Sequence, residues 1–473
     1  MVATWILKEL NRILEKARFR KLNSTYYEDL ERLHTILVPP GLRVLEIGSG
    51  LGDLLASVKP GFGMGIEADS ELCEASKLRF PDLNFINQDL GTVTPESLGV
   101  IEPFDIIVLS NALNYIEDVQ RLLAGLGSFC HPRTRLVLSF HNWLWQPILK
   151  AAETIGQRQA QPPESWLSPT DMANLLDLAG WEVLKQGRRC LLPRRVPGLT
   201  TIANRWLSQL PLLEHLGVTN WMVARPISVA ANRPSVSVII PARNEAGNIE
   251  SAIRRIPEIG KFTEVIFVEG HSSDSTWEQI QRVCHEYTGP LRLSCFQQSG
   301  KGKANAVWLG FEKATADILM ILDADLTVKP EDLPRFYEAL ASGRGEFVNG
   351  CRLVYPRSHK AMPQLNTAAN RFFAGAFSWL LRQPMKDTLC GTKVLWKTDY
   401  NAIKAGQAYF GDFDPFGDFD LLFGAAKLNL KIVEVPIRYQ ERTYGASNIA
   451  HFREGLVLAA MCLYAAKKLR FLP

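Results

Sequence analysis

Two blocks of the chain alternate short apolar runs with segments in which apolar residues recur at helical spacing. Apolar runs bounded by turn residues predict buried strands, and the segments between them predict helices. The predicted strands are 43–47, 64–67, 84–86, 104–109 and 136–140 in the first block, and 236–240, 264–268, 291–296 and 318–322 in the second. This alternation is typical of α/β folds, in which right-handed crossovers bring the ends of parallel strands to one edge of the sheet.

A break in composition separates the two blocks. Residues 224–235 combine two prolines with small residues, which is typical of a linker between domains. A length of 473 residues suits two or three domains. We therefore predict one domain over residues 1–224, a linker over 225–235 and a second domain over 236–473.

Charge and cysteine content narrow the classes of function. The net charge is only +4, and no run of basic residues is interleaved with aromatics, so the sequence predicts no nucleic-acid partner. The eight cysteines are scattered without a C-x-x-C pair. This spacing argues against a zinc site or a disulfide framework and favours a cytoplasmic protein.

Both ends of the chain bear on membrane association. Residues 1–21 mix charged and apolar residues at helical spacing, which predicts an amphipathic helix and not a secretory signal. The apolar stretch 455–466 is much shorter than the ~20 residues of a spanning helix. Because Lys467, Lys468 and Arg470 follow it, this stretch suits either an interfacial helix on the inner face of a membrane or a terminal helix that packs on the core.

A glycine-rich turn follows the first predicted strand. Gly48, Gly50 and Gly52 are spaced G-x-G-x-G, which lets the backbone turn sharply and approach a ligand that lacks a pyrophosphate. Glu67 ends the second predicted strand, where an acid can accept hydrogen bonds from both ribose hydroxyls. Asp89 follows the third predicted strand and is placed to meet an adenine amino group.

These features resemble class I S-adenosylmethionine-dependent methyltransferases. The match comprises Glu46–Gly52, Glu67, Asp89 and residues 104–118, and it extends over about residues 25–185. The resemblance implies a Rossmann-like domain that binds S-adenosylmethionine through Glu46, Gly48, Gly50, Gly52, Glu67 and Asp89. A nicotinamide dehydrogenase is disfavoured by the glycine spacing, and a domain that only binds the cofactor or acts as a scaffold stays an alternative.

The sequence does not identify the methyl acceptor. His141 follows the fifth predicted strand and is either a general base for a hydroxyl or a hydrogen-bonded structural histidine. Trp143, Trp145 and Trp166 either line an acceptor pocket or belong to the core.

In the second block, the apolar run Ile318–Leu322 ends in two carboxylates, Asp323 and Asp325. A buried strand of this kind delivers both acids to the edge where open α/β sheets bind ligands. Hard cations such as Mg²⁺ or Mn²⁺ prefer oxygen ligands and neutralise the charge on a departing diphosphate. The alternative is that Asp325 only caps a loop.

The order of motifs around these acids resembles family-2 glycosyltransferases with a GT-A fold. The Pro-x-x-Asn-Glu motif is present at residues 241–245, and an acid ends the second strand of the block. The resemblance implies that Asp323 and Asp325 bind the metal. It also implies a site for a UDP- or GDP-sugar, formed by Pro241, Glu245, Glu269, Lys303 and Asp323.

Residues 349–352, 386–393 and 419–448 narrow the resemblance to the dolichol-phosphate mannose synthase group, over about residues 235–455. That group implies inverting transfer of a sugar to a polyprenyl phosphate, with acceptor-phosphate contacts from Arg352, Lys393, Arg438 and Ser447, and with Arg442 among the catalytic residues. The lysine of the group's Gly-Glu-Ser-Lys motif is replaced here by Asn448. The sequence Glu269-Gly-His-Ser replaces Asp-Asp-Gly-Ser and leaves the nucleobase open.

The acceptor decides whether a base is needed. A lipid phosphate is already ionised at neutral pH and needs only cations to position it. A sugar hydroxyl, as in synthesis of cell-surface polysaccharide, would need a carboxylate base, for which Asp420 is the candidate; its alternative role is structural. The sequence as a whole predicts a bifunctional cytoplasmic enzyme.

Overall fold

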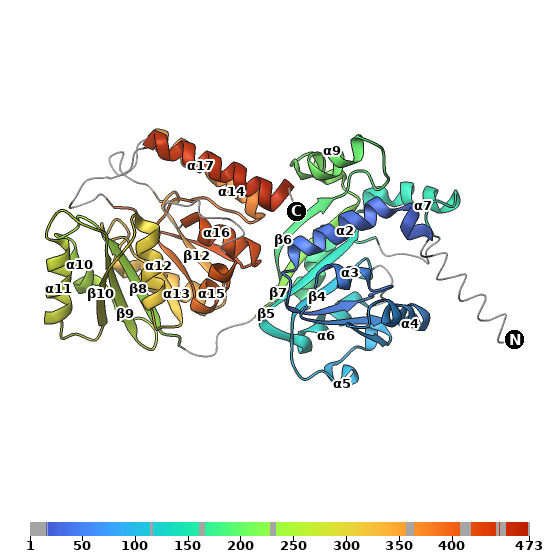
Figure 1. Cartoon of the computed structure of the whole chain (residues 1–473), viewed down its shortest axis with the longest axis horizontal. Coiled ribbons are helices and arrows are strands. Elements are labelled where there is room, and N and C mark those ends of the chain that lie inside the picture. Colours follow the sequence, from blue (N-terminus) through green and yellow to red (C-terminus); the bar gives the residue numbers. More distant parts are fainter. Residues whose placement is uncertain are drawn as a thin grey trace. The chain divides into compact units, whose positions relative to one another are not determined.

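The structure is a computed structural model of the chain. It describes residues 16, 18–113, 116, 118–159, 166–227, 233–355, 364–406, 418–440, 444 and 451–471. Contacts between Cα atoms divide the chain into two compact units (Figure 1). Unit 1 comprises Met1–Ile227 with Leu469–Pro473, and unit 2 comprises Ser228–Lys468.

Unit 1 is built on a seven-stranded mixed sheet with the order β3-β2-β1-β4-β5-β7-β6. The first five strands of that order are parallel, and β7 is antiparallel to both of its neighbours. The strands are β1 (Arg43–Ile47), β2 (Phe62–Glu67), β3 (Asn84–Asn87), β4 (Phe104–Ser110), β5 (Cys130–His141), β6 (Trp181–Arg189) and β7 (Thr219–Pro226).

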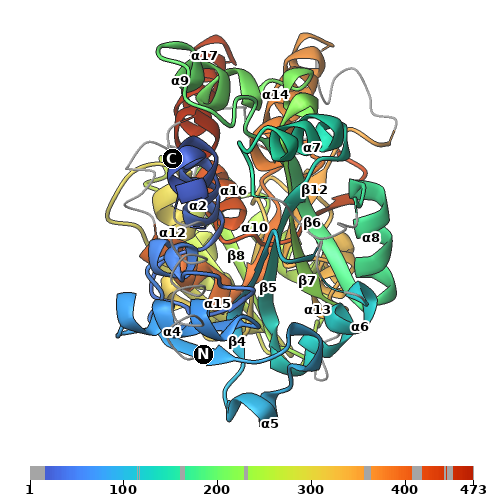
Figure 2. The ribbon, with the colours of Figure 1, turned by 90° about the vertical axis from the view of Figure 1, so that its right-hand side faces the viewer.

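Helices cover both faces of this sheet, which explains why its central strands are apolar on both sides. One core cluster joins the sheet to α6 and α8, and another joins it to α2 and α3. Figure 2 shows α2 on one side of the strands and α6 and α8 on the other. The helices are α2 (Ser24–Leu37), α3 (Asp53–Ser57), α4 (Ser70–Arg79), α5 (Pro95–Leu98), α6 (Val119–Gly125), α7 (Gln146–Thr154), α8 (Pro169–Leu178) and α9 (Leu199–Arg205). Short 3₁₀ turns are η1 (Leu90–Thr92), η3 (Leu126–Phe129), η4 (Trp143–Trp145), η5 (Leu207–Gln209) and η6 (Leu213–Leu216).

Unit 2 has a second seven-stranded mixed sheet, with the order β10-β9-β8-β11-β13-β12-β14. The strands β8 to β11 are parallel, β13 is antiparallel to β11 and β12, and β14 is parallel to β12. The strands are β8 (Val236–Ala242), β9 (Thr263–Glu269), β10 (Arg292–Gln297), β11 (Ile318–Ile321), β12 (Phe347–Cys351), β13 (Lys393–Trp396) and β14 (Ile432–Pro436).

The core of unit 2 lies between this sheet and helices that include α10, α11 and α13. The helices of the unit are α10 (Ile249–Arg255), α11 (Thr276–Glu286), α12 (Lys303–Lys313), α13 (Leu333–Ala341), α14 (Gln364–Leu381), α15 (Lys397–Ala405), α16 (Asp418–Lys427) and α17 (His451–Ala466). The 3₁₀ turn η7 (Pro330–Asp332) precedes α13, and the π-helix η9 (Lys467–Phe471) follows α17.

The predicted α/β class is confirmed for both units. Each predicted strand is present; β1 has the predicted bounds, and the other strands have shifted ends. The strands β6, β7, β12, β13 and β14 were not predicted. The strand β7 continues to Pro226, so regular structure extends into the predicted linker 225–235. Most of the predicted amphipathic helix at 1–21 lies outside the described residues.

The structure bears on the membrane prediction at the C-terminal end of the chain. None of the helices in the described part of the chain is long and apolar enough to cross a bilayer. In α17, Met461 is buried whereas Leu463 is 74% exposed. Both alternatives for this helix therefore stay open.

Candidate active sites

The glycine turn of unit 1 lies at the carboxyl end of β1. Gly48, Gly50 and Gly52 all have positive φ, at 77°, 56° and 79°. A Cβ atom on Gly48 would lie 2.7 Å from the Ala112 side chain, and one on Gly52 would lie 2.7 Å from the Phe85 ring. A Cβ atom on Gly50 would meet nothing within 4 Å. The turn therefore needs glycine for packing at two positions and for backbone conformation at all three.

Glu67 closes this turn from the end of β2. Its two carboxylate oxygens accept hydrogen bonds from the Gly50 N–H at 2.7 Å and the Asp69 N–H at 2.9 Å. Asp89 is exposed after β3, and its carboxylate accepts the Gly91 N–H at 2.8 Å. Glu67 and Asp89 thus follow neighbouring parallel strands, as a nucleoside site at this edge requires.

Glu46 differs from the other predicted cofactor residues because it is buried in β1. Burial raises the pKa of its carboxyl well above the usual value, and Oε2 has no hydrogen-bond partner. Its predicted contact with the cofactor stays a prediction. The half-buried Gly50 and Glu67 and the exposed Asp89 form a donor and acceptor set that fits the nucleoside part of S-adenosylmethionine.

His141 lies at the end of β5 in a polar cluster. The Tyr26 hydroxyl lies 3.2 Å from His141 Nε2 and accepts a hydrogen bond from Asn111 Nδ2 at 2.9 Å. Burial lowers the pKa of His141 to about 3, so its imidazole is neutral near pH 7, and Nδ1 is buried without a partner. The Trp166 ring packs 6.0 Å from the imidazole ring. Both alternatives for His141, a base and a structural residue, are compatible with this geometry.

The other two tryptophans near His141 differ in their surroundings, because Trp145 packs against the core cluster that contains α2 and Trp143 does not. Trp143 is exposed, and the half-buried Trp145 donates a hydrogen bond from Nε1 to the Leu216 carbonyl at 2.8 Å.

In unit 2, two buried acids lie at the ends of the neighbouring strands β8 and β9. Glu245 follows β8 and accepts a hydrogen bond from Asn248 Nδ2 at 2.7 Å. Glu269 ends β9 and accepts the Ser272 N–H at 2.5 Å and Gln297 Nε2 at 3.2 Å. Burial alone would raise the pKa of Glu269, but these hydrogen bonds outweigh it and lower the pKa. Glu269 is therefore ionised and available to accept bonds from a ligand.

The loop after β8 is tied to the loop after β9. Asn244 has a φ of 57°, and its side chain accepts the Ser273 N–H at 2.8 Å. Pro241 pairs with Val268 in the sheet just before this loop. A Cβ atom on Gly247 would lie 2.7 Å from the Tyr444 ring, so Tyr444 packs directly against the loop.

Asp323 follows β11 and forms an ion pair with Lys303 at the start of α12, with 2.6 Å between Oδ1 and Nζ. Burial alone would raise the pKa of Asp323, but Lys303 outweighs it and lowers the pKa. Lys393 and Arg352 act on Asp323 in the same direction. A side chain at Gly391 would overlap Asp323 Oδ2 and lie 2.5 Å from Lys303 Nζ. The site is thus closely packed and rich in positive charge.

Asp325 is only 8% exposed. Its Oδ1 atom accepts the Thr327 N–H at 3.1 Å and the Thr327 hydroxyl at 2.8 Å, so this acid does cap the loop after β11. The two roles are compatible, because both bonds from Thr327 go to Oδ1 and a carboxylate has a second oxygen. In the part of the chain that the structure describes, no three acidic, histidine or cysteine side chains form a metal-binding group.

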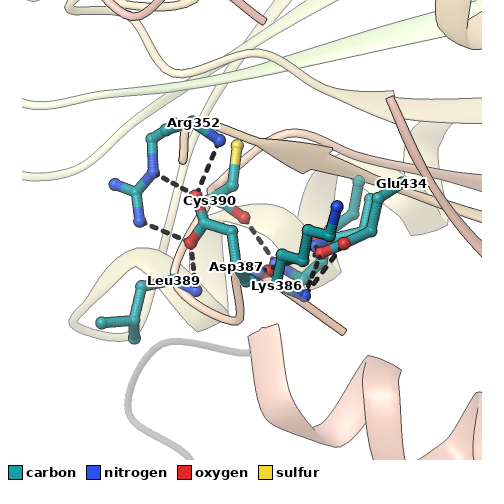
Figure 3. A network of polar contacts seen from close by, with 8 residues as sticks. Arg352, Lys386, Asp387, Leu389, Cys390 and Glu434 are labelled. Atoms are coloured by element: carbon teal, nitrogen blue, oxygen red, sulfur yellow. Dashed lines mark hydrogen bonds and ion pairs between the residues drawn. The ribbon is translucent and has the colours of Figure 1, made fainter. Parts of the chain in front are cut away.

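Arg352 and Glu434 hold the loop 386–391 from two sides (Figure 3). The Arg352 guanidinium forms two hydrogen bonds with the Asp387 carboxylate, at 2.7 and 2.8 Å. Glu434 accepts the N–H groups of Lys386 and Asp387 at 2.9 to 3.0 Å. Since Gly391 ends this loop, the two contacts help to position Gly391 against Asp323. Asp387 and Glu434 were not singled out from the sequence.

The remaining predicted residues are placed differently. Lys393 is wholly buried, and its ammonium donates to the Cys390 carbonyl at 2.6 Å. Arg438 is exposed and lies 5.5 Å from the centre of the Tyr355 ring. Asp420 is buried in the first turn of α16. Arg442 and Ser447 lie outside the described residues, so their predicted roles have no structural description.

Family models match the two units separately. Residues 10–186 match a model described as a methyltransferase domain. Residues 237–401 match a model described as glycosyl transferase family 2. The first segment includes the glycine turn, Glu67 and Asp89, and the second includes Glu245, Glu269 and the acidic pair.

Two sugar transferases are similar to part of this chain. Dolichol-phosphate mannosyltransferase of Pyrococcus furiosus is 29% identical over 219 residues, which cover 45% of this chain and 59% of that protein. Undecaprenyl-phosphate 4-deoxy-4-formamido-L-arabinose transferase of Pseudomonas aeruginosa is 33% identical over 112 residues, which cover 23% of this chain and 33% of that protein. The chain therefore spans at most 59% of the length of these two relatives.

Among solved structures, an S-adenosylmethionine-dependent methyltransferase of Thermotoga maritima is 14% identical with a TM-score of 0.35, and the match covers 45% of this chain and 95% of that chain.

Proposed function

We propose that this chain is a bifunctional enzyme. The premise is that it carries a methyltransferase domain in unit 1 and belongs to the family-2 glycosyltransferases through unit 2. Unit 2 transfers a sugar from a nucleotide-sugar to a polyprenyl phosphate with inversion. Unit 1 transfers a methyl group from S-adenosylmethionine to a small molecule, a lipid or a glycan.

One observation carries the proposal for unit 2. Asp323, an ionised acid at the end of the central strand β11, is paired with Lys303 and packed against Gly391. The neighbouring strands β8 and β9 place Glu245 and Glu269 at the same edge. An acid for a cation and two acids for a nucleoside at one sheet edge fit a nucleoside diphosphate.

Asp323 and Asp325 would hold a Mg²⁺ or Mn²⁺ ion. Their carboxylate oxygens suit a hard cation, which commonly takes one or two carboxylates and completes its shell with phosphate and water. When bound, the ion supplies positive charge that offsets the charge of the leaving diphosphate. Lys303 contributes a further positive charge beside the same acid.

The positive side chains around Asp323 favour a phosphate acceptor over a hydroxyl. Arg352 and Lys393 lower the pKa of Asp323, so both lie close enough to act on charge at this site. Arg352 is bound to Asp387 and Lys393 is buried, so we do not assign either residue a direct contact with the acceptor phosphate. Their positive charges would instead stabilise the phosphate at longer range. The exposed Arg438 is the residue proposed to contact it.

The test combines acceptors with one variant. Full-length protein is incubated with labelled UDP- or GDP-sugars, Mn²⁺, and either a short polyprenyl phosphate or the corresponding polyprenol, and lipid-soluble label is measured. The proposal expects label with the phosphate only, and near-normal transfer by Asp420→Asn. Transfer to a hydroxyl acceptor that Asp420→Asn abolishes would establish the alternative, polysaccharide-type reaction instead.

The proposal for unit 1 has its own test. The Gly50 turn and the carboxylates of Glu67 and Asp89 support binding of the adenosine part of the cofactor. Calorimetry should detect S-adenosylmethionine binding that Glu67→Gln weakens. A protein that binds no S-adenosylmethionine would leave unit 1 with a scaffolding role.

A further inference from the structure

Unit 1 has an unusually apolar surface that lies apart from the glycine turn, Glu67 and Asp89 in the sequence. More than half of the large apolar residues that are exposed in the described chain fall in two segments, 143–155 and 196–216. We call this surface the α7–α9 face, and its main residues are Trp143, Leu144, Ile148, Leu199, Ile202 and Leu212. Leu212 is 84% exposed and Ile202 is 52% exposed. Soluble proteins rarely collect protruding apolar side chains in this way unless the surface binds something.

The two segments form one continuous surface because hydrogen bonds join them at both ends. Trp145 Nε1 and Asn142 Nδ2 donate to the carbonyls of Leu216 and Gly217, at 2.8 and 2.9 Å. At the other end, Arg194 donates to the Gln157 side chain at 2.5 Å. Figures 1 and 2 both place α7 and α9 at the same end of unit 1. The apolar side chains are therefore held on a folded scaffold.

Interior hydrogen bonds hold the second segment in shape. The buried Asn204 side chain accepts the Leu192 N–H at 2.8 Å and donates to the Leu192 carbonyl at 2.7 Å. On the outer side, Trp206 stacks on Phe471 of the last described residues of unit 1, with 5.0 Å between ring centres, and stays 49% exposed. Contacts within unit 1 therefore hold this segment in shape.

The exposed charges at this face have one sign. Lys150 is exposed in the first segment, and Arg194 and Arg195 are exposed just before the second. No acidic side chain of residues 142–158 or 190–216, all of which the structure describes, is exposed. Glu153 is instead paired with Arg158. A face of this kind attracts anionic groups and repels positively charged surfaces.

We propose that the α7–α9 face docks on the surface of an anionic lipid bilayer. Tryptophan and leucine side chains that project from short helices suit the boundary between headgroups and acyl chains, and flanking arginine and lysine suit anionic headgroups. A second copy of the chain fits less well, because it would bring the same excess of positive charge to both sides of an interface. The inference goes beyond the two reactions, because docking needs neither the sugar donor nor S-adenosylmethionine.

The experiment is flotation of the full-length protein with vesicles, without nucleotide-sugar or S-adenosylmethionine. Vesicles of phosphatidylglycerol with phosphatidylethanolamine are compared with vesicles of phosphatidylcholine alone. The wild type should float with the anionic vesicles. The variant Ile202→Ser/Leu212→Ser should lose roughly tenfold or more in its partition coefficient, because it removes two inserted side chains. Lys150→Glu/Arg195→Glu should lose the preference for anionic lipid.

A matched control uses equally exposed apolar residues elsewhere on unit 1. Leu78 on α4 and Ile101 after α5 are 85% and 98% exposed. The variant Leu78→Ser/Ile101→Ser should float like the wild type, and thermal unfolding checks that every variant is folded.

Three results would overturn the proposal. The first is that the wild type does not float with anionic vesicles, and the second is that Ile202→Ser/Leu212→Ser floats as the wild type does. The third is that Leu463→Ser alone abolishes flotation, which would assign membrane binding to α17. Sedimentation velocity adds a fourth, a dimer that Ile202→Ser/Leu212→Ser dissociates. If Ile202→Ser/Leu212→Ser loses flotation but still transfers sugar to a water-soluble acceptor at the wild-type rate, membrane docking is separate from the proposed reactions.

Discussion

The two candidate sites differ in what forms them. In unit 1 the candidate site is built on the backbone of one short turn, Gly48–Gly52, closed by the carboxylate of Glu67. In unit 2 charged side chains from separate elements meet around Asp323. A change in backbone conformation should therefore disable unit 1, whereas a change in charge or close packing should disable unit 2. The following variants test that difference.

The largest effect is expected from the charge of Asp323. Asp323→Asn should lower the rate of sugar transfer by about 1000-fold, because the site loses a proposed cation ligand and the ion pair with Lys303. Binding of S-adenosylmethionine, measured by calorimetry, should not change. Asp317→Asn is the control: this acid lies at the opposite end of β11, where it accepts hydrogen bonds from Ser235. If both variants lose transfer equally, the charge at the site is not the cause.

A smaller loss is expected from adding one methyl group beside that charge. Gly391→Ala should lower sugar transfer by about 100-fold, because its Cβ overlaps Asp323 Oδ2 and separates the ion pair with Lys303. Gly375→Ala is the control, since Gly375 lies in the helix α14 with open space around it. That change should keep activity and raise the unfolding temperature slightly. Normal transfer by Gly391→Ala would show that packing around Asp323 is not critical.

The corresponding test in unit 1 changes the backbone. Gly50→Val should weaken S-adenosylmethionine binding by about 30-fold, because valine strongly disfavours the φ of 56° at this position. Sugar transfer should persist. Gly99 also has positive φ and open space, at 63°, but it ends α5 away from the turn. Gly99→Val therefore imposes similar strain, and an equal loss of cofactor binding in that variant would point to general destabilisation.

The smallest effect concerns the pH dependence of unit 1. Burial lowers the pKa of His34 in α2 to about 4, and its imidazole lies 2.8 Å from the Leu30 carbonyl. Between pH 6.5 and 4 the unfolded chain binds a proton that the folded chain does not, so this histidine destabilises the fold increasingly as pH falls. Relative to His34→Gln, the wild type should lose up to about 1.4 kcal/mol of unfolding free energy per pH unit below 6.5.

Hydrogen exchange of α2 in urea, measured for both proteins across this pH range, reports that difference. A constant difference between wild type and His34→Gln would mean that the imidazole titrates normally in the folded protein.

The difference between the two candidate sites also explains which of their residues could be predicted from the sequence. The glycine turn, Glu67 and Asp89 follow three successive strands at short range, so their order identified the edge where they lie. Asp323 was recognisable because an apolar strand ends abruptly in acid. Gly391 and Glu434 carried no such local signal, since their importance comes from contacts across the sheet with Asp323 and with the loop 386–391.

The missed strands have a related cause. The strand β6, with the sequence WEVLKQGRR, mixes polar and apolar residues in no clear alternation, and it is held by pairing with β7. The short strand β13 is held in the sheet by antiparallel pairing with β11 and β12. Pairing with distant segments overrides a weak local preference for strand or helix, and a single sequence does not reveal that pairing.

The central claim is that the acidic pair after β11 binds a cation together with the nucleoside diphosphate. Calorimetry of UDP and GDP binding, with and without Mn²⁺, tests it most directly in the wild type and in Asp325→Asn. We predict that Mn²⁺ tightens binding of one nucleotide at least tenfold in the wild type and has little effect in Asp325→Asn. Equal tightening in both proteins would contradict the account.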